Sequence, residues 1–300
     1  MFARLGIFGV GLIGGSIAKA ARLNQLANTI IGYGREQDLA NLKLAKQLRV
    51  IDEYFINDEI ITDLKNHSRS NDCIMIATPV ASIESILQLL KPVWSDNSIY
   101  TDVGSTKANI IEAANLVFGT IPTNLVPAHP IAGAENSGVQ AALNDLFINR
   151  RLIITPVSNT NPQAVAIIKQ FWQQLGSSVF EMSAQHHDSI LAATSHLPHL
   201  LAFALVDMLG HKNEQSDILK YAAGGFKDFT RIASSDPTMW TAICSANKTE
   251  IIPLLEQYKN ELTKLQCLLS SDNSNELFAL FNYAKQTRQH FLEQFDKPKE

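Results

Sequence analysis

Three glycines near the start of the chain have the spacing of a loop that could hold phosphate groups. In the stretch GIFGVGLIGGSIAKA (6–20), Gly9, Gly11 and Gly14 follow the pattern G-x-G-x-x-G, directly after an apolar run (4–10) typical of a buried parallel strand. In that context the first glycine makes a tight turn, the second lets the backbone approach a pyrophosphate, and the third lets a helix pack on the strand. The amino end of that helix would offer free N–H groups to the phosphates.

The same stretch superficially resembles a secretion signal, because Arg4 precedes an apolar run that ends in small residues. Cleavage there would remove the first strand and with it the fold, so we prefer the dinucleotide site. We expect its cofactor contacts to come from the glycine loop and from the end of a later strand (71–79), namely from Gly9, Gly11, Leu12, Ile13, Gly14, Thr78 and Pro79.

The end of the next predicted strand (28–34) bears on the choice of cofactor. An acidic residue about 20 residues after the glycines usually binds the ribose 2′-hydroxyl of NAD. Here Gly34 stands at that position and Arg35 follows it. Glycine leaves room for a 2′-phosphate and an arginine can pair with it, so the sequence favours NADP over NAD. The alternative is that Arg35 is a solvated loop residue and that Glu36 or Asp38 binds the ribose.

Four further clusters of polar residues could carry chemistry: DVGSTK (102–107), AHPIAGAENSG (128–138), TSHLPHLLA (194–202) and GGFKDFTRIASSDPTMW (224–240). The first two follow predicted strands, at 98–105 and within 123–133. Ligands of open α/β sheets bind beyond the carboxyl ends of the strands, so both loops should face the cofactor crevice.

The elements that position these clusters change character near residue 182. Strands and helices alternate up to that point, with further strands at 151–157 and 177–183 and helices at 80–94 and 163–176. This alternation predicts an α/β Rossmann-type domain with a parallel-sheet core over 1–182. The remainder, 183–300, reads as an all-α domain with helices at 184–211, 214–223, from Pro237 to about 269, and 274–295.

Composition excludes several classes of protein. The 300 residues are 46% hydrophobic, enough for two domains, and a net charge of −4 without a basic run argues against nucleic acid as a partner. Cys73, Cys244 and Cys267 form neither a metal-ligand pattern nor a disulfide framework, so we expect no metal and a reducing, cytoplasmic location. The apolar stretch 189–209 contains histidines and an aspartate that are costly in lipid, which favours a buried core helix over a membrane span.

These motifs together resemble those of the prephenate dehydrogenase family, which includes arogenate and cyclohexadienyl dehydrogenases of tyrosine biosynthesis. The resemblance covers nearly the whole chain: GLIGGS (11–16), DVGSTK, HPIAG (129–133), HD (187–188), TSHLPH and GGFKDFTRIASSDPTMW. It implies an oxidative decarboxylation in which a hydride leaves C4 of a cyclohexadienol ring for the nicotinamide and loss of CO2 makes the ring aromatic. It also implies a homodimer formed through the helical domain. Prephenate would give 4-hydroxyphenylpyruvate, and arogenate would give tyrosine.

The resemblance assigns roles to particular residues. His129 matches the catalytic histidine that takes the hydroxyl proton, and Ser105 matches a serine that binds the same hydroxyl. Arg231 matches the arginine that binds the ring carboxylate, a task suited to its two parallel hydrogen bonds. Ser195 and His199 match positions that line the substrate site, and Gly224 and Trp240 match positions that reach this site from the partner subunit. Glu135 and Asp228 match a gate that contains carboxylates. We expect His196 to be structural.

Two features depart from the family or limit the assignment. Gly34 replaces the acidic residue of NAD-using members, and Ala134 stands where many members have serine. We expect no chorismate mutase domain before residue 4 and no regulatory ACT-type domain after the helices, so that any inhibition by tyrosine would act at the active site.

Two other functions fit the sequence less well. A β-hydroxyacid dehydrogenase shares the layout but uses a lysine on the interdomain helix, and 184–211 contains none. A non-catalytic NAD(P)-binding regulatory protein would have no need for His129, Ser105 and Arg231 together.

Overall fold

The structure of the chain is a computed structural model that describes residues 1–67, 72–133, 136–213 and 215–295. Its contacts divide the chain into two compact units, Met1–Glu250 and Ile251–Glu300. The sheets, helices α1 to α11 and every candidate site residue that the structure describes belong to the first unit. The predicted domain boundary after residue 182 stays a prediction.

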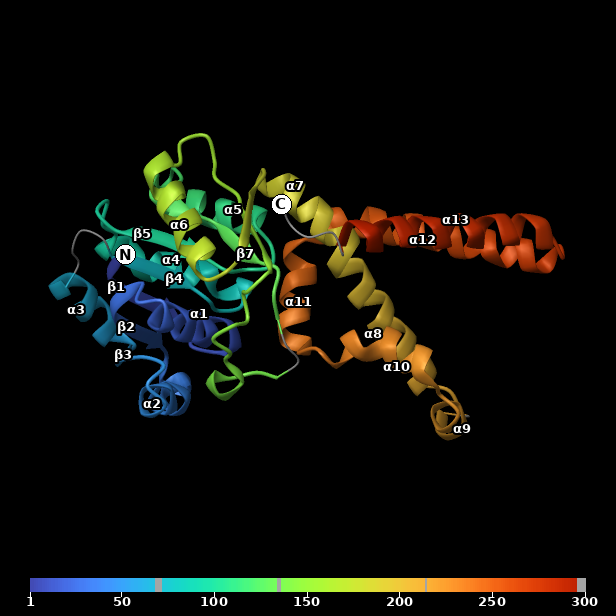
Figure 1. Ribbon diagram of the computed structural model, residues 1–300, viewed down its shortest axis with the longest axis horizontal. Helices are drawn as coiled ribbons and strands as arrows, with labels where there is room; N and C mark the ends of the chain where they lie inside the picture. Colours follow the sequence, from blue (N-terminus) through green and yellow to red (C-terminus); the bar gives the residue numbers. More distant parts are fainter. Residues whose placement is uncertain (68–71, 134–135, 214, 296–300) are drawn as a thin grey trace. The chain divides into compact units, whose positions relative to one another are not determined.

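A parallel sheet of six strands forms the centre of the first unit, in the order β3-β2-β1-β4-β5-β6 (Figure 1). This is the strand order of a Rossmann fold, which confirms the predicted fold class. The chain order reverses between β1 and β4, so a crevice for ligands is expected beyond the carboxyl ends of these two strands. The six strands are β1 (Phe2–Phe8), β2 (Ala27–Gly34), β3 (Glu53–Ile56), β4 (Cys73–Ile76), β5 (Ile99–Asp102) and β6 (Leu125–Val126).

Two details of the sheets differ from the sequence-based prediction. The short edge strand β3 was not predicted, because its half-exposed residues lack the apolar run of the central strands. The predicted strand within 123–133 splits at Pro127, which has no N–H to donate to a ladder. The second piece starts a separate sheet in which the first pair is antiparallel: β7 (Ala128–Pro130), β8 (Arg151–Ile154) and β9 (Ser178–Glu181).

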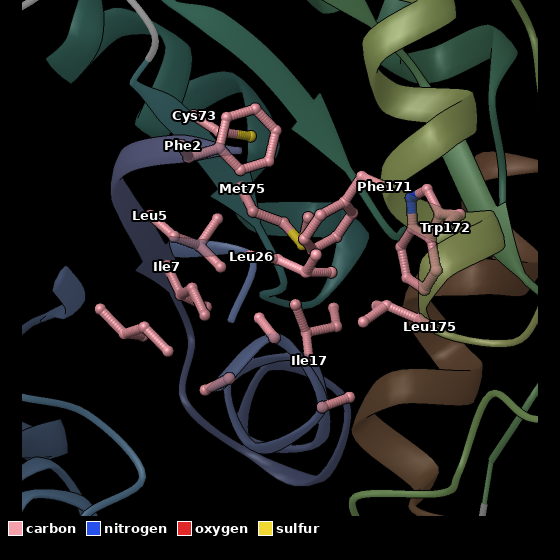
Figure 2. Close-up of a cluster of buried hydrophobic side chains, with 14 of the residues drawn as sticks. Phe2, Leu5, Ile7, Ile17, Leu26, Cys73, Met75, Phe171, Trp172 and Leu175 are labelled. Atoms are coloured by element: carbon pink, nitrogen blue, oxygen red, sulfur yellow. The ribbon is translucent and has the colours of Figure 1, made fainter. Parts of the chain in front are cut away.

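Apolar residues on both faces of the sheet form the core. Along β4, Cys73 and Met75 point into one cluster while Ile74 and Ile76 point into the other. In the first cluster they meet helices on that face, as Figure 2 shows for Ile17 of α1 and for Phe171 and Trp172 of α6. Burial of both faces explains why β1 and β4 are continuous apolar runs in the sequence.

Helices cover the sheet and continue the chain beyond it. Those between strands are α1 (Leu12–Leu23), α2 (Leu39–Gln47), α3 (Asp58–His67), α4 (Ile83–Leu90), α5 (Ala108–Phe118) and α6 (Pro162–Gln174). The later ones in the first unit are α7 (Ala184–Leu191), α8 (Leu197–Gly210), α9 (Gln215–Lys220), α10 (Gly224–Thr230) and α11 (Pro237–Ala246). Most of α12 (Lys248–Ser270) and all of α13 (Ser274–Phe295) belong to the second unit.

Two of the long predicted helices are interrupted. The helix predicted over 184–211 contains a π-helical turn, Ala192–His196, just before Pro198. The helix predicted from Pro237 to about 269 breaks at Asn247, whose buried side chain bonds to other elements. A π-helical turn often marks a functional site, and this one contains the predicted substrate residue Ser195.

The apolar stretch that was predicted to be a buried core helix is only partly buried within the single chain, and many of its residues are half-buried. The helical segment Ala184–Gly210 is long and apolar enough to span a membrane by length and composition alone. Only Ala202 of α8 is buried, and Val206 and Met208 are exposed. The prediction of a fully buried helix is therefore wrong for one chain, because α8 packs on α10 and the turn Arg231–Ser234 and still leaves residues such as Val206 and Met208 exposed.

The glycine loop depends on close packing between α1 and β1, and two of its glycines make a matched test. A Cβ at Gly14 would lie 2.2 Å from the carbonyl oxygen of Gly9, whereas a Cβ at Gly11 would meet nothing within 4 Å. We predict that Gly14→Ala lowers the free energy of unfolding by about 2 kcal/mol or more. Gly11→Ala should cost no more than about 1 kcal/mol, the usual effect of alanine at a helix N-cap.

Urea unfolding of the two variants measures this difference. Equal stabilities for Gly14→Ala and Gly11→Ala would contradict the predicted packing of α1 on β1.

Candidate active site

The glycine loop has the geometry of a dinucleotide cradle. Gly9 has φ +85°, a left-handed conformation that favours glycine, and a Cβ there would meet the Ala77 backbone at 2.7 Å. Gly11 borders open space at the amino end of α1, where backbone N–H groups are unpaired by the helix itself. The loop therefore leaves room for a pyrophosphate beside these N–H groups, and the residues present fit a nicotinamide dinucleotide.

The end of β4 forms the other side of this crevice. A Cβ at Gly9 would lie 2.9 Å from the Thr78 methyl group, so Thr78 lies beside the glycine loop. The Thr78 hydroxyl is buried and finds no hydrogen-bond partner among the described residues. Asn41 closes the crevice from α2, because its side chain bonds the Val10 carbonyl at 2.7 Å and the Val139 amide at 3.2 Å.

The residues expected at the ribose form a small surface cluster after β2. The Arg35 side chain is exposed, and its Nε donates to Asp38 Oδ2 at 3.2 Å. The same oxygen accepts from the Arg35 amide at 2.9 Å. Asp38 also lies 3.0 Å from where a Cβ of Gly34 would be, so both the basic and the acidic candidates stand at the predicted ribose position.

His129 lies in β7 and is 9% exposed. Its Nδ1 lies 2.9 Å from Nε2 of His187 in α7. The His187 Nδ1 in turn lies 2.7 Å from Asp188 Oδ1. The predicted catalytic histidine is thus linked through a second histidine to a carboxylate, all three side chains being nine-tenths or more buried.

Asp188 also forms the cap of α5. Its Oδ1 and Oδ2 accept the backbone N–H groups of Lys107 and Ala108, each at 2.8 Å. Lys107, at the N-cap position, makes no side-chain cap of its own, so the carboxylate comes from 80 residues further along the chain. A carboxylate is favourable there because it satisfies N–H groups and faces the positive end of the helix.

A buried ion pair holds the loop between β5 and α5. The Lys107 ammonium bonds to Asp102, and it also donates to the Ala128 carbonyl at 2.9 Å. Asp102 accepts the Gly104 and Ala128 amides at 2.7 and 3.2 Å. Burial lowers the pKa of Lys107 and raises that of Asp102, and in each case the partner's charge opposes the shift. These bonds attach the DVGSTK loop to the residue that precedes His129.

His196, in the π-helical turn, is a further buried histidine. Its Nδ1 lies 3.0 Å from the side-chain nitrogen of Asn247, which also donates to the Asp188 carbonyl at 2.8 Å. An amide nitrogen can only donate, so His196 accepts at Nδ1 and carries its proton on Nε2. Asn247 explains why the predicted helix breaks there, and it joins His196 to the Asp188 backbone, which agrees with a structural role.

His199 and Trp240 meet as a stacked pair, with ring centroids 3.7 Å apart. The Ser195 carbonyl accepts from His199 Nδ1 at 2.8 Å, so neutral His199 has its lone pair on Nε2. Burial first and then the positive charge of Arg231 lower the pKa of His199, which places Arg231 within electrostatic range of it. Ser195, His199, Arg231 and Trp240 are thus brought together within one chain.

The other predicted residues are less tightly placed. Ser105 is half-buried in the loop before α5, Gly224 and Asp228 are exposed on α10, and Pro79 is exposed after β4. Trp240 contacts His199 of its own chain, and the contribution of Trp240 and Gly224 to a partner subunit's site stays a prediction. Glu135 and Ala134 lie outside the described residues.

Four residues of the cluster received no role from sequence reasoning: His187, Asp188, Lys107 and Asn247. The first two form the motif HD, and Lys107 ends the motif DVGSTK. The sequence thus singled out these residues without indicating which groups they contact. Their partners lie as far as 81 residues away in the chain, a separation that no local pattern encodes. Asn247 carried no signal, because it reads as one residue within a long helix.

The electrostatics keep these histidines neutral. Burial is the main cause that lowers the pKa of His129, His187 and His196, the last to about 4. Lys107, His187 and His196 lower the pKa of His129 further. Burial alone would raise the pKa of Asp188, but hydrogen bonds from His187 and from the Ala108 and Lys107 amides outweigh it and lower that pKa. A neutral imidazole beside an ionised carboxylate is suited to accept a proton.

These shifts predict that the protein loses stability as the pH falls from 7.5 to 5. A histidine whose pKa is lower in the folded state takes up its proton on unfolding, so stability is complete above pH 6.5 and declines below it. For His196, a change from 6.5 to about 4 corresponds to about 2 kcal/mol at pH 5. Urea unfolding at the two pH values measures the loss.

The matched variants for this prediction are His196→Gln and His211→Gln, the second replacing an exposed histidine after α8. His196→Gln should reduce the pH dependence, and His211→Gln should leave it unchanged. An equal fall in stability in the wild type and in His196→Gln would contradict the assignment.

Comparisons with known proteins agree with this geometry. Residues 17–181 match the nucleotide-binding domain of prephenate dehydrogenase, and residues 183–283 match its dimerization domain. Cyclohexadienyl dehydrogenase of Zymomonas mobilis is 31% identical over 96% of both chains, and prephenate dehydrogenase of Bacillus subtilis is 37% identical over 93% of this chain and 74% of its own.

Among solved structures, prephenate dehydrogenase from Aquifex aeolicus with hydroxyphenyl propionate and NAD+ has a TM-score of 0.88 at 34% identity, covering 97% of this chain and 99% of that one. Synechocystis arogenate dehydrogenase has a TM-score of 0.78 at 27% identity, with coverage of 96% and 99%. The chain belongs to the prephenate dehydrogenase family.

Proposed function

We propose that this protein catalyses the oxidative decarboxylation of prephenate to 4-hydroxyphenylpyruvate with a nicotinamide cofactor, in the biosynthesis of tyrosine. The observation that carries the proposal is the position of His129, a neutral buried imidazole linked to a carboxylate, in a chain with a dinucleotide cradle. Relatives named prephenate and cyclohexadienyl dehydrogenases support the substrate class.

The reaction balances with His129 as the proton acceptor. His129 takes the proton of the C4 hydroxyl as that carbon becomes a carbonyl. The nicotinamide, when bound, supplies the acceptor for the hydride that leaves C4. The electron pair of the bond to the ring carboxylate then enters the ring as CO2 leaves, and the phenolate oxygen recovers a proton from His129. The chain therefore ends the cycle in its starting protonation state.

The remaining residues bind and orient the substrate in this proposal. Arg231 binds the ring carboxylate, because its planar fork matches a carboxylate and its charge acts on the neighbouring His199. Ser105 bonds the reacting hydroxyl from the loop that Lys107 and Asp102 hold in place. Ser195, His199, Gly224 and Trp240 line the substrate site, and Asp228 with Glu135 forms the gate.

For the cofactor, we propose a preference for NADP. The Arg35 guanidinium carries the proposal, because it has donors beyond the one that Asp38 accepts. The place of a Gly34 side chain is taken by Asp38 and Leu42, so the 2′-phosphate would have to bind on the Arg35 side. Asp38 offers the opposing argument, since its carboxylate could accept from a ribose hydroxyl of NAD. Whether Arg35 or Asp38 contacts the ribose end of the cofactor therefore decides between NADP and NAD.

For the assembly, we propose a homodimer formed through the helical domain, 183–300. Exposed apolar residues are frequent on the helices of that region, which is unusual for a surface that stays in water. Those on α12 and α13 include Ile252, Leu255, Tyr258, Leu262, Leu269, Phe278, Phe281, Tyr283 and Phe291. The match of 183–283 to a dimerization domain supports the same surface.

The test is a rate assay of the purified protein with four combinations of substrate and cofactor. Prephenate and arogenate are each supplied with NAD+ and with NADP+, and the reduced nicotinamide is followed by absorbance. Turnover of prephenate supports the proposal, and turnover of arogenate alone would move it to arogenate dehydrogenase. No turnover in any combination would overturn it in favour of another hydroxyacid or a regulatory role.

We predict that His129→Asn lowers kcat roughly 100-fold or more, because the variant loses the general base. The dissociation constant of the cofactor should stay within about twofold, since the glycine loop is untouched. Steady-state kinetics and cofactor titration measure the two quantities. Near-normal turnover by a folded His129→Asn protein would remove His129 from the mechanism.

We predict that Arg35→Ala weakens NADP+ about 10-fold while NAD+ changes by less than about twofold, since one charge-assisted contact to the 2′-phosphate is lost. Arg22→Ala is the matched control, because it removes another exposed arginine that pairs with a carboxylate, here Asp52. Equal effects of Arg35→Ala on both cofactors would show that another residue binds the phosphate.

A further inference from the structure

Two hydrogen bonds connect His129 to Asp188 through His187, and their chemistry fixes where the protons lie. The distances are 2.9 Å from His129 Nδ1 to His187 Nε2 and 2.7 Å from His187 Nδ1 to Asp188 Oδ1. A neutral imidazole has one N–H and one lone pair, so each bond needs one donor and one acceptor. One end of this series of hydrogen bonds can only accept, and that end decides which nitrogen of each ring carries the proton.

That end is Asp188. An ionised carboxylate can only accept hydrogen bonds, and the Lys107 and Ala108 amides already donate to it. His187 must therefore donate from Nδ1, which leaves the lone pair on its Nε2. The His187 Nε2 then accepts, so His129 must donate from Nδ1. The lone pair of His129 is left on Nε2, the ring nitrogen that does not face His187.

We propose that His187 and Asp188 are positioning residues that hold His129 in the Nδ1–H tautomer, with Nε2 as the proton acceptor. The inference rests on the proposed function for its kinetic consequence, while the proton positions are a property of the resting protein. The tautomer of a catalytic histidine is set by the bond that its other nitrogen makes, and here that bond ends at a helix-capping carboxylate. When His129 takes a proton, both of its nitrogens carry hydrogen, and the bond to His187 is kept.

The neighbouring groups leave this direction unchanged. The groups whose charges lower the pKa of His129 are His187 of α7, Lys107 in the loop before α5, and His196 in the π-helical turn. Lys107 donates to Asp102 and to the Ala128 carbonyl. His196 has its Nδ1 on Asn247. Among the residues that the structure describes, none of these bonds competes for His129 Nδ1 or His187 Nε2.

The test compares His187→Gln with His187→Leu. The glutamine side chain can place an oxygen near the former Nε2 and accept from His129 Nδ1, whereas leucine has similar bulk and no acceptor. His187→Leu should lower kcat roughly 10- to 100-fold with KM within about threefold, as expected for a lost orienting partner. His187→Gln should recover most of that loss. His186→Leu is the matched control, because His186 is the exposed neighbour on the same helix.

A second measurement does not depend on turnover. Nitrogen-15 NMR of histidine-labelled full-length protein reports which nitrogen of each imidazole is protonated, and His129→Asn identifies the His129 signals. We expect Nδ1–H for His129 in the wild type and in His187→Gln, and mixed tautomers in His187→Leu. An Nε2–H form in the wild type, or equal kcat for the wild type and His187→Leu, would overturn the inference. If the wild type turns over no substrate, the proposed function fails, while the NMR result still decides the proton positions.

Discussion

The bond between Asp188 and the amino end of α5 is the constraint on which the rest of the site depends. One carboxylate satisfies two backbone N–H groups of a helix in the nucleotide-binding part and one ring nitrogen of His187. The helix has no local cap, so the carboxylate of α7 is required there. A helix-capping interaction thereby connects α5 to the position of His129, the proposed catalytic base.

Burial then sets the chemistry of the cluster. A carboxylate in this environment stays ionised only because three donors hold it, and the histidines beside it are neutral because water is excluded. The ion pair of Lys107 with Asp102 holds the loop before α5 against the strand of His129. The charged groups of this cluster are therefore paired or hydrogen-bonded, and neutral His129, the proposed base, is held by groups that take no part in the proposed reaction.

Sequence patterns predicted the parts whose cause is local. The glycine spacing predicted the cradle, because each glycine is required by the turn or close contact at its own position. The central strands were predicted from their apolar runs. The edge strand β3 and the separate sheet of β7, β8 and β9 were missed, because pairing between distant segments decides them. The same reason explains why no role was predicted for His187, Asp188, Lys107 and Asn247. The HD motif nevertheless contains two of the three side chains that link His129 to the cap of α5.

In the proposed reaction, this cluster couples hydride loss to decarboxylation of a cyclohexadienol diacid. The most direct measurement uses prephenate labelled with carbon-13 in the ring carboxylate and counts labelled CO2 against reduced nicotinamide. The account predicts a one-to-one ratio in the wild-type protein. Reduced nicotinamide formed without labelled CO2 would contradict it, because the reaction would then be a simple alcohol oxidation.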